Sequence, residues 1–296
     1  MNLIKPKNLK YGDTIAIIAP SGDVESKKIE NAKHYFENRG FNIKFGKHIF
    51  KKFDYLAGND IDRLEDLHWA FSDKSIDAII CARGGYGAIR LLNKIDYDLI
   101  SQNPKIFCGY SDITALNAII LKKTGLITFS GPMAQCDFGN NIDKFTENSF
   151  FNTVTNLSFN ISAYNPVIYN KGNAQGLIFG GNLTTIASIC GLDFIPDDKF
   201  IFFAEDIGES AYKIDRYFTQ LFNIEKFRNN ISAIILGDFS NIDNQNYLDT
   251  YFKTLADNNK NIPIIAGFPI GHEIKKATVM YGAMTKLENN SIISVL

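Results

Sequence analysis

At 296 residues the chain is long enough to form two domains, each with a buried core. Its 45% apolar and 21% charged residues are the proportions of an ordinary globular protein, and its net charge of −1 excludes the basic surface of a nucleic-acid-binding protein. Every apolar run is too short for a membrane span or a signal-peptide core, so we expect neither a nucleic-acid nor a membrane partner.

The first half of the chain alternates short apolar runs with amphipathic stretches. The runs, each of which predicts a strand, are Thr14–Ile18, 41–45, 77–82, 105–109 and 126–130. The stretches with helical periodicity are 25–38, 61–71, 88–93 and 113–123. This alternation predicts an α/β domain over residues 1–140, flavodoxin-like or Rossmann-like, with helices on both faces of a parallel sheet and binding groups at the carboxyl ends of the strands.

The pattern weakens in the Asn-rich segment that follows, and we expect a linker over 141–172 with one short helix at 144–153. A smaller, β-rich α+β domain is predicted over 173–296. Its strand-like runs are 200–206, 231–239, 262–268, 278–284 and 291–296, and its helical stretches are 183–190, 211–222 and 247–257.

The four cysteines, Cys81, Cys108, Cys136 and Cys190, lie far apart in the sequence. Their spacing is typical of free thiols in a reducing compartment and not of a disulfide scaffold or a zinc site. We therefore expect a cytoplasmic protein.

A glycine-rich turn, ARGGYGAIRLL, follows the predicted strand at 77–82. Gly84, Gly85 and Gly87 would let the backbone approach a ligand closely and direct N–H groups at an anion. The spacing matches neither GxGxxG nor GxxxxGK[ST], so the segment alone is equally well read as a tight strand-to-helix turn.

Ser111, in the string GYSDI, stands between a predicted buried strand and a predicted helix. A serine at this junction projects its hydroxyl group from the carboxyl end of the strand, as in a nucleophile elbow, although GYSDI is not GxSxG. Serine and aspartate are also favoured helix caps, and from this segment alone a cap is the better interpretation.

A base for Ser111 can be sought by elimination because the chain has only four histidines. His34 and His68 lie inside predicted helices and His48 in a basic irregular stretch, whereas His272 follows the strand-like AGFPIG and a glycine turn. A carboxylate partner is offered by Glu205 at the end of FIFFAED. Its competitors are the adjacent Asp206 and the more distant Glu209, and Glu205 could instead form an ion pair with Arg216 or Lys213 on the following helix.

Five strings, GDTIAIIAPSG, ARGGYGAIRLL, GYSDITAL, AEDIGESAYKIDR and GFPIGH, together resemble the LD-carboxypeptidase family of serine peptidases, in the family's order and across most of the chain. The resemblance implies a catalytic triad of Ser111, Glu205 and His272. It further implies an oxyanion hole formed by the N–H groups of Gly85, or the neighbouring Gly84, and of Asp112.

The resemblance also implies a homodimer that removes terminal D-alanine from murein tetrapeptides during cell-wall recycling, by cutting the L,D bond after meso-diaminopimelate. A second branch of the family resembles microcin immunity proteins that hydrolyse peptidyl-nucleotides, and the GGYG string favours the murein branch. Arg83 is a candidate for holding the substrate carboxylate, or a structural ion-pair residue. Because histidine activates the serine, we expect no metal or organic cofactor. The competing interpretation is a non-catalytic module that binds a small anion at the glycine-rich turn.

Overall fold

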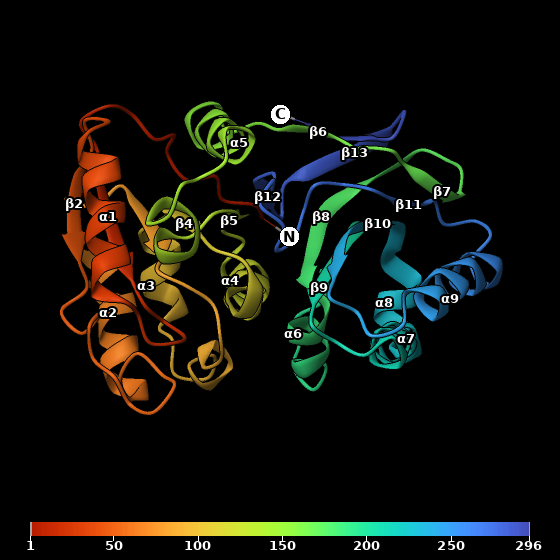
Figure 1. The fold of residues 1–296 in the computed structure, drawn as a ribbon, viewed down its shortest axis with the longest axis horizontal. Helices are drawn as coiled ribbons and strands as arrows, with labels where there is room; N and C mark the ends of the chain where they lie inside the picture. The colour runs from red at the N-terminus through yellow and green to blue at the C-terminus, as the bar shows by residue number, and fades with distance from the viewer. Residues whose placement is uncertain (1, 296) are drawn as a thin grey trace.

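The computed structural model describes residues 2–295, which form two β-sheets lying side by side, each with its own helices (Figure 1). The first sheet has six strands in the order β12-β5-β4-β3-β1-β2. They are β1 (Thr14–Ile18), β2 (Asn42–Phe45), β3 (Ala78–Cys81), β4 (Ile106–Cys108), β5 (Thr128–Ser130) and β12 (Val279–Tyr281). The first five are parallel, in the flavodoxin-like order 2-1-3-4-5, and β12 pairs antiparallel with β5.

The helices of this half are α1 (Ser26–Glu37), α2 (Asp60–Ser72), α3 (Tyr97–Gln102) and α4 (Thr114–Thr124). The predicted α/β fold class is therefore confirmed. The helix expected at 88–93 is reduced to a 3₁₀ turn, Ala88–Arg90, which begins after Gly87 with its φ of 136°. Residues Ala134–Phe138 form a π-helical turn after β5.

The second sheet has eight strands in the order β6-β14-β13-β8-β9-β10-β11-β7. Its strands are β6 (Asn160–Ser162), β7 (Val167–Asn170), β8 (Ala174–Asn182), β9 (Phe200–Ile207), β10 (Ile231–Ser240), β11 (Ile264–Ala266), β13 (Met284–Glu288) and β14 (Ser291–Ser294). Its helices are α6 (Leu183–Ser188), α7 (Ala211–Asn223), α8 (Glu225–Asn230) and α9 (Gln245–Asn258). Strands β8 to β11 are parallel and the outer strands are antiparallel, which is the mixed α+β arrangement expected for this half.

The segment expected as a linker, 141–172, holds regular structure. It contains α5 (Lys144–Asn156), which is longer than the expected helix, and both edge strands of the second sheet, β6 and β7. The sequence predicted no strands here because β6 and β7 are short and mostly exposed, so they carry no run of buried apolar residues.

The apolar run 278–284 is shared between the two sheets. Gly282, with a φ of 90°, turns the chain between β12 in the first sheet and β13 in the second. This segment therefore connects the two halves by supplying a strand to each sheet. The halves are also in contact through α4, which packs against β8 and α6 (Figure 1). At this contact the backbone N–H of Asn182 donates to Oγ1 of Thr114 at 3.2 Å.

Candidate active site

Ser111 follows β4 and begins a 3₁₀ turn that leads into α4. Its φ of 63° lies in the left-handed region, which is uncommon for a residue other than glycine and costs on the order of 1 kcal/mol or more. A strained, half-buried serine between a parallel strand and a helix is the geometry of a nucleophile elbow. The helix-cap interpretation finds no support, because the side chain of Ser111 makes no hydrogen bond within residues 2–295.

The glycine-rich turn after β3 lies against Ser111. A Cβ atom added to Gly84 would stand 2.7 Å from Cβ and 2.8 Å from Oγ of Ser111, and 3.4 Å from the backbone nitrogen of Asp112. Gly84 is therefore required by a close approach, and its exposed neighbour Gly85, with a φ of 111°, adopts a backbone conformation that favours glycine. The turn is thus packed onto the serine.

Glu205 and His272 are hydrogen-bonded to each other. Nδ1 of His272, on the loop after β11, lies 2.7 Å from Oε2 of Glu205 on β9, and the two side chains are 15% and 3% exposed. Burial of the ring disfavours its charged form, but the hydrogen bond and the negative charge of Glu205 outweigh this and raise the pKa of His272. A carboxylate on Nδ1 favours the tautomer in which Nε2 is free to accept a proton.

The Ser111 turn and the His272 loop are in contact through Tyr110. Its ring lies edge-on to the imidazole of His272, with centroids 5.0 Å apart. No direct hydrogen bond between Ser111 and His272 occurs in the part of the chain that the structure describes, although hydrogen bonds of this kind are often long before substrate binds. The residue that precedes Ser111 thus packs against the ring that Glu205 holds.

The comparisons with known proteins agree with this geometry. Residues 15–131 match the model of the LD-carboxypeptidase N-terminal domain and residues 175–287 that of the C-terminal domain. The chain is 35% identical to the probable murein peptide carboxypeptidase of Bacillus subtilis, and the match covers 98% of this chain and 94% of that protein. The chain belongs to the LD-carboxypeptidase family.

Solved structures of the family superpose along the whole chain. An MccF-like protein from Bacillus anthracis has a TM-score of 0.89 at 29% identity, covering 99% of each chain. A muramoyltetrapeptide carboxypeptidase from Oxalobacter formigenes has a TM-score of 0.84 at 30% identity, covering 95% of this chain and 97% of its own. Both the two-domain architecture and the carboxypeptidase character of the family thus extend to this chain.

In this LD-carboxypeptidase family member the two competing carboxylates are occupied elsewhere. Asp206 accepts hydrogen bonds from Asn182 at 3.1 Å and from the backbone and hydroxyl of Thr184 at 2.9 and 2.8 Å, which fixes the start of α6. Glu209 forms an ion pair with Lys213 at 2.9 Å. Of the three acidic residues, only Glu205 contacts His272.

The side chain of Asp112 connects two turns of the first half. Its Oδ2 accepts from Oγ of Ser21 at 2.5 Å and from the backbone N–H of Ala88 at 2.8 Å, so it links the turn after β1 to the glycine-rich turn. Desolvation by burial raises the pKa of this carboxyl group. These bonds hold the Asp112 backbone beside Gly84, where a Cβ atom on the glycine would stand 3.4 Å from the Asp112 nitrogen.

Arg83 is half-buried and its guanidinium donates to the backbone carbonyl of Asp23 at 3.1 Å. Within residues 2–295 it forms no ion pair, so the interpretation of Arg83 as a structural ion-pair residue is wrong. Its charge remains available to an anionic group of a ligand.

Sequence reasoning missed a buried ion pair beside the site. Nζ of Lys276 lies 2.6 Å from Oδ1 of Asp137 and 5.2 Å from the centroid of the Tyr110 ring. It also missed Asp238 on β10, considered below. The signal for Asp238 was present, because it follows the apolar run ISAIILG much as Glu205 follows FIFFA.

The loop that carries His272 is fastened to α5. Oγ1 of Thr146 donates to the carbonyl of Ile274 at 2.9 Å and accepts from the backbone N–H of Lys276 at 2.9 Å. Three residues along the helix, Oγ of Ser149 accepts from the backbone N–H of Thr278 at 2.9 Å. These three bonds place α5 behind the site.

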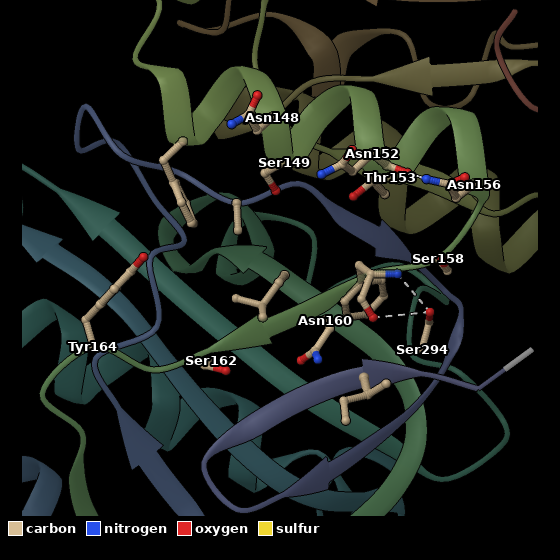
Figure 2. Close-up of a pocket in the computed structure, with 15 residues that line it drawn as sticks. Asn148, Ser149, Asn152, Thr153, Asn156, Ser158, Asn160, Ser162, Tyr164 and Ser294 are labelled. Carbon is tan, nitrogen blue, oxygen red and sulfur yellow. Dashed lines mark hydrogen bonds between the residues drawn. The ribbon is translucent and has the colours of Figure 1, made fainter.

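A groove of about 770 Å³ lies between α5 and β6 (Figure 2). Uncharged amide and hydroxyl groups from both walls point into it, among them Asn148, Asn152 and Asn156 on α5 and Asn160 on β6. The groove includes neither Ser111 nor His272, so it is separate from the candidate active site.

The structure also bears on the expectations for metal sites, cysteines and membrane spans. Within residues 2–295 no group of three or more His, Cys, Asp or Glu side chains is arranged to hold a metal ion. All four cysteines are free thiols, and Cys136 is exposed. No helix of the described chain has the length and apolarity required to cross a bilayer.

Proposed function

We propose that this protein is a serine peptidase in which Ser111 is the nucleophile, His272 the general base and Glu205 the residue that orients the base. The observation that carries the proposal is the 2.7 Å hydrogen bond between Glu205 and Nδ1 of His272, on a loop that contacts the strained turn of Ser111. This arrangement of nucleophile, base and orienting carboxylate is what acyl transfer requires.

In the acylation step Oγ of Ser111 attacks the scissile carbonyl carbon and its proton passes to Nε2 of His272. The resulting oxyanion is held by the N–H groups of Gly85 and Asp112, where losing one donor typically costs about 10²–10³ in rate. As the C–N bond breaks, His272 gives the proton to the departing amine. Glu205 stabilises the imidazolium throughout.

In the deacylation step water attacks the carbonyl carbon of the acyl-enzyme and gives a proton to His272, which returns it to Oγ of Ser111 as the ester C–O bond breaks and the shortened peptide leaves. Arg83 holds the carboxylate of the terminal D-alanine, which makes the enzyme a carboxypeptidase rather than an endopeptidase. This role is supported by the unpaired guanidinium close to the glycine-rich turn.

The substrate we propose is a murein tetrapeptide, cut between meso-diaminopimelate and D-alanine in cytoplasmic cell-wall recycling by a homodimeric enzyme. The names of the Bacillus subtilis and Oxalobacter formigenes relatives support the substrate class. The MccF-like structure favours a second candidate, a hydrolase of peptidyl-nucleotides. Incubation of the protein with a murein tetrapeptide and with an aminoacyl-nucleotide analogue distinguishes the two.

The catalytic assignment is tested with Ser111→Ala, His272→Ala and Glu205→Ala, assayed by release of D-alanine. Each variant should lose most turnover while keeping the circular dichroism spectrum of the wild type. Asp206→Ala should lose stability instead. Turnover retained by Ser111→Ala would exclude the serine mechanism, and a serine-directed probe that labels no residue would indicate a non-catalytic binding module.

A further inference from the structure

Asp238 lies on β10 at an irregularity in the sheet. Leu236 pairs with Ala204 and Phe239 with Asp206, so two residues of β10, Gly237 and Asp238, stand opposite the single residue Glu205 of β9. A β-bulge of this kind redirects side chains and occurs frequently beside active sites. Here it brings a second carboxyl group toward Glu205.

The side chain of Asp238 lies against the turn that carries His272. A Cβ atom on Gly271 would stand 3.0 Å from Cβ and 3.2 Å from Oδ2 of Asp238, and Gly271 has a φ of 149°. The backbone N–H of Asp238 also donates to the carbonyl of Ile270 at 2.8 Å. Asp238 therefore supports the two residues that precede His272.

Two carboxylate oxygens of this region are buried and lack a hydrogen-bond partner among the described residues, Oε1 of Glu205 and Oδ2 of Asp238. Buried polar atoms are normally paired, so their presence together beside a hydrogen-bonded histidine calls for a functional explanation. The charged groups that act on Asp238 are Glu205 from β9 and His272, Glu273 and Lys276 from the loop after β11.

We propose that Asp238 is a positioning residue of this site, whose carboxyl group supports the Gly271 turn and whose negative charge stabilises the protonated form of His272. The inference rests on the proposed role of His272 as the base. It adds a second carboxylate, through the bulge of β10, to the one that Glu205 supplies.

The titration of Asp238 bears on the same reaction. Burial, and then the charges of Glu273 and Glu205, raise the pKa of Asp238 to about 7. The charge of His272 in turn lowers the pKa of Asp238, so the titrations of the two groups are coupled. In the wild type the acidic limb of kcat/KM should accordingly be broader than the curve of a single group.

The test is the pKa of the His272 ring, measured by NMR in the wild type and in Asp238→Asn, together with the pH profile of kcat/KM. Removing the negative charge should lower the pKa of His272 by about half a pH unit or more and narrow the acidic limb to a single-group curve. Asp257→Asn, an equal change of charge on the exposed face of α9, should leave both measurements unchanged.

An unchanged pKa of His272 in Asp238→Asn would overturn the inference. Because Asn has the shape of Asp and removes a buried charge, the variant should fold, and Asp238→Ser provides the same uncharged comparison if it does not. The NMR titration needs no substrate. If the wild type hydrolyses no peptide, the proposed function fails, while the effect of Asp238 on His272 is still decided.

Discussion

Two neighbouring acidic residues on β9 perform different tasks because successive side chains of a strand point to opposite faces of the sheet. Glu205 faces His272, whereas Asp206 faces the start of α6. Asp206 has every acceptor occupied, and Glu205 keeps one oxygen free. The alternation along the strand does not distinguish the two, because it does not reveal which side chain faces His272; only the resemblance of the AEDIGESAYKIDR string favoured Glu205.

The pH dependence of turnover should report the bond between Glu205 and His272. Since Glu205 raises the pKa of His272, the wild-type kcat/KM should rise with pH through a value above the ordinary 6.5 of histidine. In Glu205→Gln the negative charge bonded to the ring is lost while burial still lowers the pKa of His272, so the acidic limb should move to lower pH, and kcat should fall by about 10²–10⁴-fold. A limb that stays in place, measured from pH 5 to 9, would contradict the assignment.

Gly84 is predicted to be intolerant of a single methyl group. In Gly84→Ala the new Cβ would overlap with the Ser111 side chain, which must shift, and kcat/KM should fall by at least about 10²-fold. Gly191→Ala is the matched control, because a Cβ at Gly191 meets no atom within 4 Å. Thermal unfolding of both variants should stay close to the wild type; equal activity in the two would show that the turn does not need to approach Ser111.

The sequence predicted helices and strands best where they depend on a local pattern of apolar residues. The five parallel strands of the first sheet and the helix after Ser111 follow directly from apolar runs and helical periodicity. The loop position of His272 followed from the AGFPIG string. By contrast, the division of 278–284 between two sheets, the edge strands β6 and β7 and the bulge in β10 depend on pairing between distant segments, which no local pattern contains.

Helix α5 holds the loop after His272 in place through hydrogen bonds that the sequence likewise does not predict. In Thr146→Val two hydrogen bonds to the loop after His272 are lost, so the loop should become more mobile and kcat should fall by about tenfold. Thr155→Val on the same helix is the control, since among the described residues its hydroxyl is hydrogen-bonded only to the carbonyl of Phe151. Steady-state kinetics and hydrogen exchange of the loop measure the effect, and equal kinetics in both variants would exclude it.

For the whole molecule, the site exists only when both halves are assembled. Ser111 comes from the first sheet, and Glu205 and His272 from the second half of the chain. The first sheet is also completed by β12, which covers the edge of β5. Residues 1–140 alone should therefore expose this edge and aggregate or fail to give a cooperative unfolding transition, as measured by size exclusion and circular dichroism. A stable, monomeric fragment would show that β12 is dispensable for this half.

The chain that bears His272 leaves β11 in one sheet and arrives at β12 in the other. The proposed base thus lies on the connection between the halves, and any movement of one half against the other should move the imidazole with it. The angle between the two halves therefore determines how the imidazole of His272 is aligned with Ser111. Heating or mild denaturant that weakens the contacts between the two halves should therefore abolish activity before either sheet unfolds.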